Sequence, residues 1–160
     1  MQLSKSFLIS EIPLFDDLTV DEVREVEKWM TLKKLDKGKV VYRQGTTGQS
    51  VCFVVEGKLK VVVRNEESDV IIATVSKGDT VGELALIDGL SRSADVIAAD
   101  ETTVLILKRD NFNRLVEEQP GVGVKMLRSL AKAISMTLRD RSETLARLEY
   151  RAKRPAAQAS

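Results

Sequence analysis

A short stretch near the middle of the chain combines residue types that can together hold an anion. It reads GELALIDGLSRSADV and covers residues 82–96. Gly82 permits backbone conformations that other residues rarely adopt, and the residues after it can begin a short helix whose free amides attract negative charge. Arg92 offers a planar fork of donors matched to phosphate oxygens, and Ser93 adds a hydroxyl. Glu83 is a carboxylate of the kind that accepts hydrogen bonds from a ribose hydroxyl.

The same residues also allow a purely structural interpretation. Glu83 and Arg92 can pair with each other beneath a loop, and Gly82 and Gly89 can be ordinary turn residues. Because charge pairs at the ends of strands are common, residue types and spacing leave both interpretations open.

The composition favours a binding protein over an enzyme. The chain has 160 residues, 43% of them hydrophobic and 31% charged, with a net charge of +1, which suits one globular domain without a global basic field. It contains no histidine, which excludes His-based triads and makes a zinc hydrolase or a bound metal improbable. Cys52 is the only cysteine, so no intrachain disulfide forms and a reducing cytoplasm fits. No apolar run reaches membrane-spanning length and no signal peptide is evident, so we expect a cytoplasmic protein without membrane contact.

Hydrophobic periodicity divides the elements that must position this stretch into three regions. Residues 1–30 have helical spacing, with a capping box at Thr19 and Glu22. Residues 31–108 contain short apolar runs separated by turn residues about every ten positions, the spacing of an antiparallel sandwich or barrel. Asp110 can cap a further helix that ends at Pro120, and a long helix then runs from about residue 122 to residue 154.

The stretch resembles a known motif. Residues 82–86, GELAL, followed by RSA at 92–94, resemble the phosphate-binding cassette of cyclic nucleotide-binding domains, a family that includes bacterial catabolite activator proteins and protein kinase A regulatory subunits. The resemblance extends over about residues 10–140, and Gln44-Gly45, Gly57 and Gly78-Asp79 fall where the family has strand turns. It implies an α+β fold: an antiparallel, jelly-roll-like β-roll with N-terminal helices and a long C-terminal helix.

The resemblance also implies a role for each cassette residue. Glu83 would hold the ribose 2′-hydroxyl, with help from the Gly82 backbone. The amides of Leu84 and Ala85 would face the cyclic phosphate of cAMP or cGMP. Arg92 would pair with the exocyclic phosphate oxygens, and Ser93 would add a hydrogen bond to the phosphate or the base.

Two cassette positions depart from the family pattern, and the arginine needs a partner when no ligand is bound. Ser91 stands where many members have Pro, and Asp95 stands where Thr, Asn or an aromatic residue is more usual. An acid at position 95 would alter base contacts or face solvent. A buried guanidinium without a partner is costly, so in the empty pocket we expect Arg92 to lean on Glu83, Asp88 or water.

The long C-terminal helix carries a seam of residues at alternating spacings of three and four, which we call the heptad seam. It consists of Val124, Leu127, Ala131, Ile134, Leu138, Arg141, Leu145, Leu148 and Ala152. Arg141 is its only polar member. Since a helix of roughly 30 residues spans about 45 Å, longer than this domain can cover, we predict a parallel homodimer through the seam. A second face, formed by Met126, Leu130 and Ala133, would pack on the roll. The alternative is that the seam itself packs on the roll.

Thr137 lies on this helix where catabolite activator proteins have a hydroxyl that bonds the adenine, although a boundary residue of an amphipathic helix is the simpler interpretation. After residue 154 only PAAQAS remains. A winged helix-turn-helix would need some 60 more residues, so direct sequence-specific DNA binding is not expected. We divide the chain into a nucleotide-binding roll at 1–120, a dimerisation or lid helix at 121–154 and a disordered tail at 155–160.

Three functions follow from these features. In the first, the chain is a cyclic nucleotide sensor, with cAMP favoured over cGMP, that signals through its C-terminal helix to an unknown protein effector. In the second, it is a dimeric scaffold of the same fold that docks partners regardless of nucleotide. The third, a sugar-binding enzyme of the cupin type, is disfavoured by the missing histidines and metal ligands.

Overall fold

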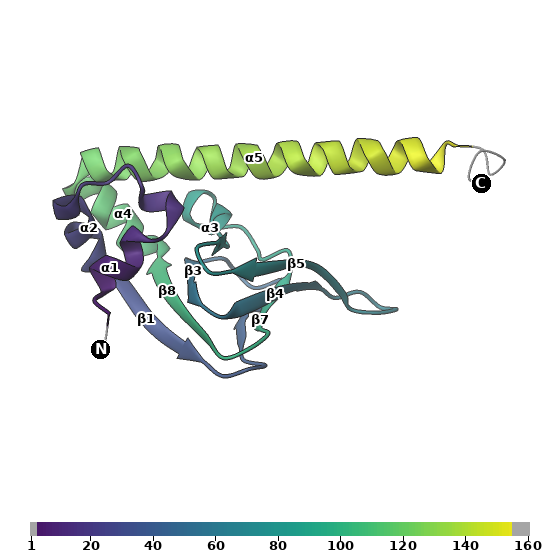
Figure 1. Ribbon diagram of the computed structural model, residues 1–160, viewed down its shortest axis with the longest axis horizontal. Coiled ribbons are helices and arrows are strands. Elements are labelled where there is room, and N and C mark those ends of the chain that lie inside the picture. The colour runs from purple at the N-terminus through teal and green to yellow at the C-terminus, as the bar shows by residue number, and fades with distance from the viewer. Residues whose placement is uncertain (1–2, 155–160) are drawn as a thin grey trace.

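Two four-stranded antiparallel sheets pack against each other in the computed structural model, which describes residues 3–154 (Figure 1). The first sheet has the strand order β1-β8-β3-β6 and the second β2-β7-β4-β5. Their bounds are β1 Met30–Leu35, β2 Val40–Tyr42, β3 Ser50–Glu56, β4 Lys58–Val63, β5 Val70–Ser76, β6 Thr80–Val81, β7 Asp95–Ala98 and β8 Thr102–Lys108. Helices pack against the first sheet, and the predicted α+β roll with N-terminal helices and a long C-terminal helix is confirmed. The tail predicted at 155–160 lies outside the described residues.

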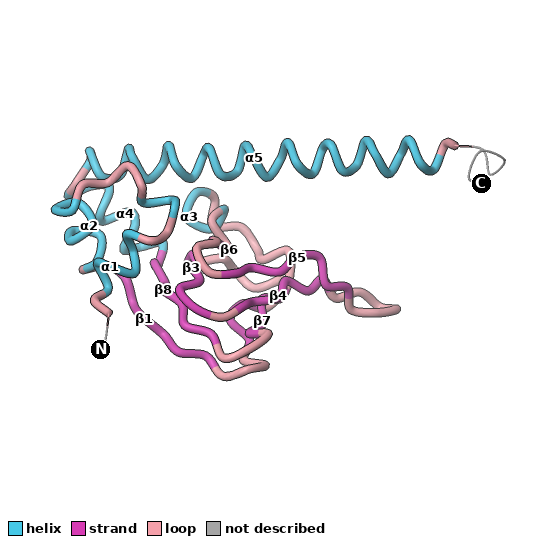
Figure 2. The backbone as a smooth tube through the Cα atoms, viewed as in Figure 1, coloured by secondary structure: helices cyan, strands magenta, loops and turns pink. Residues whose placement is uncertain are grey.

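Helices α1, α2 and α4 gather at one end of the roll, and α5 starts there and runs along its length (Figure 2). The helix bounds are α1 Lys5–Ser10, the 3₁₀ helix η1 Pro13–Phe15, α2 Val20–Glu27, α3 Leu84–Ile87, α4 Arg109–Glu118 and α5 Pro120–Ala152. One apolar core joins these helices to the first sheet, and within it the rings of Phe15 and Phe53 lie with their centroids 5.1 Å apart. A second core fills the space between the two sheets, and it includes Cys52, Leu59 and Val96. Two apolar cores therefore stabilise the roll, one between its sheets and one between the first sheet and the helices.

The capping box predicted at Thr19 and Glu22 is present. The Thr19 hydroxyl accepts a hydrogen bond from the Glu22 amide at 3.2 Å, and the Glu22 carboxylate accepts one from the Thr19 amide at 3.0 Å. Lys125 of α5 also donates to the Glu22 carboxylate at 2.6 Å. The hydrogen bonds from Lys125 and from the Thr19 amide favour the charged carboxylate, and together they hold the pKa of Glu22 below its usual value. The N-terminus of α2 is thereby tied to the start of α5.

Two predicted boundaries at the helices differ from the structure. The N-terminal helical region was expected to reach Met30, but α2 ends at Glu27 and Met30 opens β1, where it pairs with Leu107 of β8 and is buried. Asp110 is not the cap of α4, because that helix begins at Arg109 and Asp110 lies within its first turn. At Met30 the pairing with β8 ends the helical region, and at the start of α4 the Arg109 amide donates to the Gln49 carbonyl at 2.7 Å.

The long helix begins earlier than expected. α5 runs from Pro120 to Ala152, and Gln119 alone separates it from α4. Proline suits the first helical turn because its missing N–H would have no partner there. On the predicted second face, Met126 and Leu130 are buried against the helices and the sheet, whereas Ala133 is exposed and does not belong to it. Figure 1 shows the remainder of α5 passing over α3 and continuing beyond the sheets.

Candidate functional site

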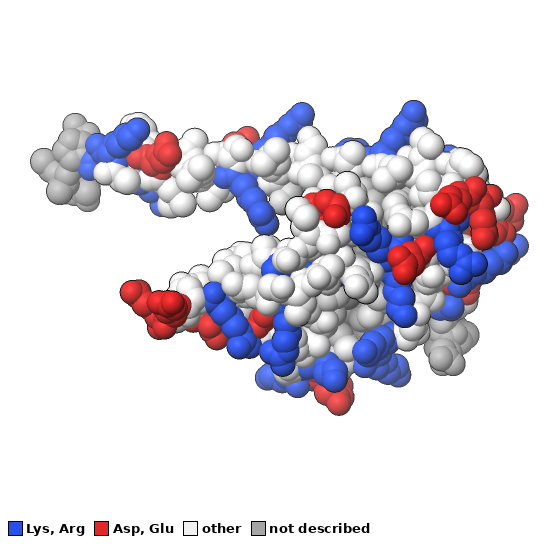
Figure 3. Space-filling model, turned by 180° about the vertical axis from the view of Figure 1, so that it is seen from behind, with Lys and Arg blue, Asp and Glu red and all other residues white. Residues whose placement is uncertain are grey.

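A pocket of about 550 Å³ lies between the roll and α5. All seven residues predicted from the sequence as ligand contacts line it: Gly82, Glu83, Leu84, Ala85, Arg92, Ser93 and Thr137. The walls on the roll side come from β4, β5, β6, α3 and the loop before β7, and Ile134, Leu138 and Arg141 of α5 face them. Figure 3 shows the molecule hollowed between the far part of α5 and the roll. The fold therefore brings these seven predicted residues together although they are up to 55 positions apart in sequence, from Gly82 to Thr137.

Gly82 is required by its conformation and by its neighbours. Its φ of +82° lies in the region that favours glycine, and a Cβ atom there would lie 2.5 Å from Nη1 of Arg92 and 3.1 Å from Cε2 of Tyr42. The chain then turns into α3. The amide of Ala85, predicted to be free for an anion, instead donates to the Gly82 carbonyl at 3.1 Å because the first turn closes on itself. The Ala85 amide therefore already has a partner within this turn, and its expected contact with a phosphate stays a prediction.

The guanidinium of Arg92 is held by backbone carbonyls. Its Nη2 donates to the Ser50 carbonyl at 2.5 Å and its Nη1 to the Gly82 carbonyl at 3.3 Å. Within residues 3–154 no ion pair joins Arg92 to Glu83 or Asp88, so the expectation that it leans on these acids is wrong. Carbonyl oxygens satisfy part of the donor fork without neutralising its charge. The positive charge of Arg92 consequently remains available to an anion.

The backbone around Arg92 is fixed by pairing with the loop that precedes β3. The Arg92 amide donates to the Thr46 carbonyl at 2.7 Å, and the Gly45 amide donates to the Arg92 carbonyl at 2.8 Å. Ser91 forms an isolated antiparallel bridge with Thr47. The serine that replaces the more usual proline at position 91 therefore sits in a paired, strand-like backbone, and the loop is not left loose. Ser93 itself is exposed at the pocket wall.

Tyr42 is a pocket residue that the sequence analysis missed. Its ring centroid lies 3.6 Å from Cζ of Arg92, and its hydroxyl shares a hydrogen bond of 2.8 Å with the Ser50 hydroxyl. Burial disfavours the charged phenolate and raises the pKa of Tyr42 to about 12. A tyrosine at the end of a strand is ordinary, since aromatic residues are common in strands, so only its pairing across the fold distinguishes it.

Asp95 neither faces solvent nor lines the pocket, contrary to both expectations. It is only 2% exposed, and its carboxylate accepts a hydrogen bond from the Gln44 amide at 2.7 Å and another from Nε of Arg64. The bond from the Gln44 amide and the nearby Arg64 charge outweigh desolvation and lower the pKa of Asp95 below its usual value. Asp95 ties β7 to β4 and to the loop at Gln44, directly beside the cassette.

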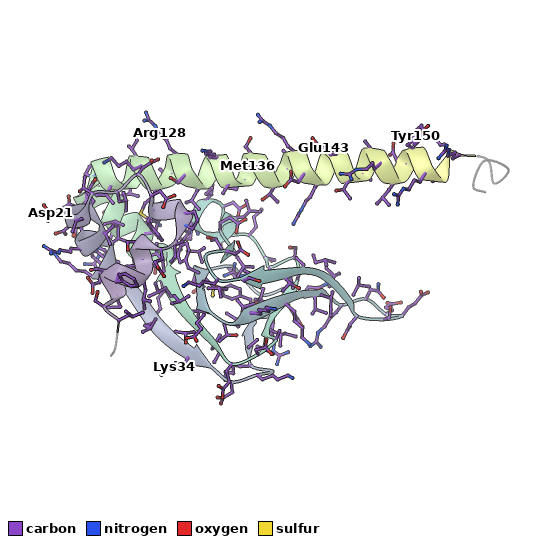
Figure 4. All side chains as sticks on the ribbon, in the orientation of Figure 1. Asp21, Lys34, Arg128, Met136, Glu143 and Tyr150 are labelled. Carbon is purple, nitrogen blue, oxygen red and sulfur yellow. The ribbon has the colours of Figure 1, made fainter. Side chains whose placement is uncertain are left out.

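The heptad seam is divided between the pocket and open surface. Ile134, Leu138 and Arg141 line the pocket, and Thr137 lies beside them on the same helix. Beyond them Leu145 and Leu148 are exposed. Figure 4 follows α5 from Arg128 through Met136 and Glu143 to Tyr150, past the end of the sheets. In the isolated chain, most of the seam therefore has no packing partner.

Neither a metal site nor a membrane span emerges from the described residues. Across residues 3–154, no three His, Cys, Asp or Glu side chains gather in a way that could hold a metal ion. None of the helices described there is both long and apolar enough to cross a membrane.

Comparison with known proteins agrees with this geometry. A sequence model described as the cyclic nucleotide-binding domain matches residues 32–119, which hold the whole cassette and both sheets except the first two residues of β1. The chain therefore belongs to the cyclic nucleotide-binding domain family. This is a family of regulatory ligand-binding domains, as the resemblance of the cassette implied.

Individual relatives support the same assignment. The chain is 38% identical over 104 residues to the cAMP-dependent protein kinase regulatory subunit of Blastocladiella emersonii, which covers 64% of this chain and 26% of that protein. A cyclic nucleotide-binding domain from Methylobacillus flagellatus superimposes with a TM-score of 0.78 at 25% identity, over 89% of this chain and 80% of that one. The catabolite activator protein of Thermus thermophilus does so with a TM-score of 0.75 at 27% identity, over 86% and 63%. The chain spans less than a third of the length of the curated relatives that it matches first.

Proposed function

We propose that the pocket binds a cyclic nucleotide, with cAMP preferred over cGMP, and that the chain acts as a non-enzymatic sensor. The observation that carries this proposal is the convergence of Glu83, the Gly82 turn and the Arg92 guanidinium on one pocket of about 550 Å³. A volume of this size suits a small ligand, and the lining combines apolar walls with a few polar groups. The preference for cAMP is supported by the 38% identity to a cAMP-dependent protein kinase regulatory subunit.

The proposed pose assigns a task to each cassette residue. Glu83 accepts a hydrogen bond from the ribose 2′-hydroxyl, and the Gly82 backbone assists it. Arg92 pairs with the exocyclic phosphate oxygens, and the Leu84 amide and the Ser93 hydroxyl face the same group. For the Ala85 amide to join them, the turn that it closes with Gly82 must open. Thr137 contacts the base from α5.

Calorimetric titration tests this proposal. Wild-type protein is titrated with cAMP and with cGMP, alongside Arg92→Ala and a control variant, Arg128→Ala, which removes the same charge from an exposed position on α5. We expect cAMP to bind more tightly than cGMP, the Arg92 variant to bind at least tenfold more weakly, and the control to match the wild type. Loss of one charge-assisted phosphate contact costs about 1.5–3 kcal/mol, which is roughly a 10- to 100-fold change. No heat from the folded wild-type protein with either nucleotide would refute the proposal.

We further propose that two copies of the chain form a parallel dimer along the heptad seam and that α5 carries the ligand signal to a protein effector. On this view residues 1–120 form the nucleotide-binding unit and residues 121–154 the dimerisation and lid helix. Leu145 of the seam is 59% exposed in the isolated chain, a large apolar side chain that a second copy would cover. The reduced, buried Cys52 is compatible with a cytoplasmic location.

Two variants on opposite sides of α5 test the dimer. Leu145→Glu places a charge in the seam, whereas Met136→Glu places one on the other side of the helix, where Met136 is 56% exposed. Analytical ultracentrifugation should show a dimer for the wild type and for Met136→Glu, and a monomer for Leu145→Glu. Hydrogen exchange of residues 121–150 should change when nucleotide binds. Identical exchange with and without a bound nucleotide would refute signalling through α5.

A nucleotide-independent dimeric scaffold is the alternative function. Its support is that Leu145 and Leu148 lie outside the pocket, so the exposed part of the seam can associate whether or not the pocket is filled. A stable dimer that gives no heat with either nucleotide would favour the scaffold.

A further inference from the structure

The guanidinium of Arg92 occupies a narrow slot, and Tyr42 forms one wall of it. Cζ of Arg92 lies 3.6 Å from the ring centroid of Tyr42, a distance at which the negative face of an aromatic ring attracts a cation. The hydroxyl of Tyr42 bonds the hydroxyl of Ser50, and the carbonyl of Ser50 accepts from Nη2 of Arg92. A single residue, Ser50, thus holds both the ring and the guanidinium at their outer edges.

Two glycines limit the space around the guanidinium. A Cβ atom on Gly82 would lie 2.5 Å from Nη1 of Arg92, and one on Gly48 would lie 3.4 Å from its Cζ and 2.8 Å from Cβ of Ala85. The backbone therefore approaches Arg92 closely where these glycines lie. The Tyr42 ring is also in contact, so the guanidinium is confined by the ring, by two backbone carbonyls and by these two glycines.

We propose that Tyr42 is a positioning residue that holds the Arg92 guanidinium in its binding orientation before a ligand arrives. This inference rests on the proposed function, because it assigns the task of Arg92 to the phosphate of a cyclic nucleotide. The carbonyls of Ser50 and Gly82 occupy one donor on each terminal nitrogen, and the remaining N–H groups can pair with phosphate oxygens. Fixing a long side chain in advance removes part of the entropy cost of binding. The ring makes the main contribution, and the hydroxyl keeps the ring in place.

A double-mutant cycle separates positioning from simple packing. Affinity for cAMP is measured for the wild type, Tyr42→Phe, Tyr42→Leu, Arg92→Gln and the double variant Tyr42→Leu/Arg92→Gln, with NMR titration for the weak binders. We expect Tyr42→Leu to weaken binding about tenfold and Tyr42→Phe by less than about threefold, because phenylalanine keeps the ring. In the Arg92→Gln background Tyr42→Leu should have almost no further effect. An equal loss in both backgrounds would overturn the proposal, since Tyr42 would then only shape the pocket.

A measurement without ligand makes the proposal independent of nucleotide binding. The ring current of Tyr42 should shift the side-chain NMR signals of Arg92 upfield in the wild type and in Tyr42→Phe, and the shift should vanish in Tyr42→Leu. If Tyr42→Leu does not fold, Tyr42→Met replaces it. If the wild type binds no cyclic nucleotide, the proposed function fails. The contact between Tyr42 and Arg92 is then judged from the NMR signals alone, and the inference fails if the Arg92 signals are the same in all folded variants.

Discussion

Replacing Asp95 by Asn should destabilise the roll, because this carboxylate is buried and bonded on two sides. In the variant, the amide oxygen can still accept from the Gln44 backbone, but a neutral acceptor replaces a charged one at this 2.7 Å contact. That exchange costs about 1 kcal/mol. The NH₂ group of Asn would replace the carboxylate oxygen that accepts from Nε of Arg64, so this hydrogen bond would be lost. Since the Arg64 side chain is 52% exposed and can turn to water, its share is only about 0.5 kcal/mol.

The expected total is a loss of about 1.5 kcal/mol in the free energy of unfolding, or a fall in Tm of about 3–6 °C for a chain of this size. Urea titration followed by circular dichroism measures it at one fixed protein concentration. Asp69→Asn on the exposed surface is the matched control and should change stability by less than about 0.5 kcal/mol.

The pH dependence of this loss distinguishes the carboxylate from general packing. The folded-state pKa of Asp95 lies below its unfolded value, so its contribution is present above the unfolded pKa of about 3.9. The contribution disappears as the pH falls through the lowered folded-state pKa, where the wild type becomes protonated as well. The difference between wild type and Asp95→Asn should therefore be constant near neutral pH and shrink in acid. If the difference in unfolding free energy between wild type and Asp95→Asn were the same in acid as at neutral pH, the reasoning would be refuted.

Three further expectations follow from the buried parts of the roll. Cys52 should not react with a disulfide reagent at pH 8 until the protein unfolds, because burial raises the pKa of its thiol to about 12; fast reaction of the native protein would contradict this. In a Tyr150→Phe background, absorbance near 295 nm should report ionisation of Tyr42 at about pH 12. The neutral, buried hydroxyl of Tyr42 should contribute its full share of the free energy of unfolding below about pH 10, and this share should be lost as the pH rises to 12. A midpoint near pH 10 would mean that the ring is solvated. Gly57→Ala should lower stability by more than about 1 kcal/mol in urea titration, because φ is +88° and the new Cβ would lie 2.8 Å from Cα of Thr102; wild-type stability would show that this turn relaxes.

Features with a local cause were predictable from the sequence. The turns at Gly45, Gly57 and Gly78 all have positive φ, which is the conformation that glycine permits and other residues avoid. The capping box at Thr19 and the cassette turn at Gly82 likewise depend on residues within a few positions of one another. Such features can be predicted from the sequence because residues close together along the chain determine them.

Contacts between distant segments could not be predicted in the same way. Arg92 was expected to pair with nearby acids or with water, but its partner Ser50 is 42 residues away. Asp95 finds Gln44 at a separation of 51 residues, and its burial depends on the register of β7 beside β4. No periodicity encodes these pairs, because they arise only when two sheets are placed against each other.

The attachment of α5 at one end gives it the geometry of a lever. Its buried residues, which lie between Val122 and Leu130, would be the pivot of the proposed movement, and 22 residues continue from 131 to 152. At 1.5 Å per residue, the free arm is about 33 Å long and Thr137 stands only about 10 Å from the pivot. A rigid tilt that moves the helix by about 1 Å at Thr137 therefore moves its far end by about 3 Å. The length of the arm sets this amplification, so shortening α5 by two turns would leave every pocket contact in place and reduce the stroke by about a third.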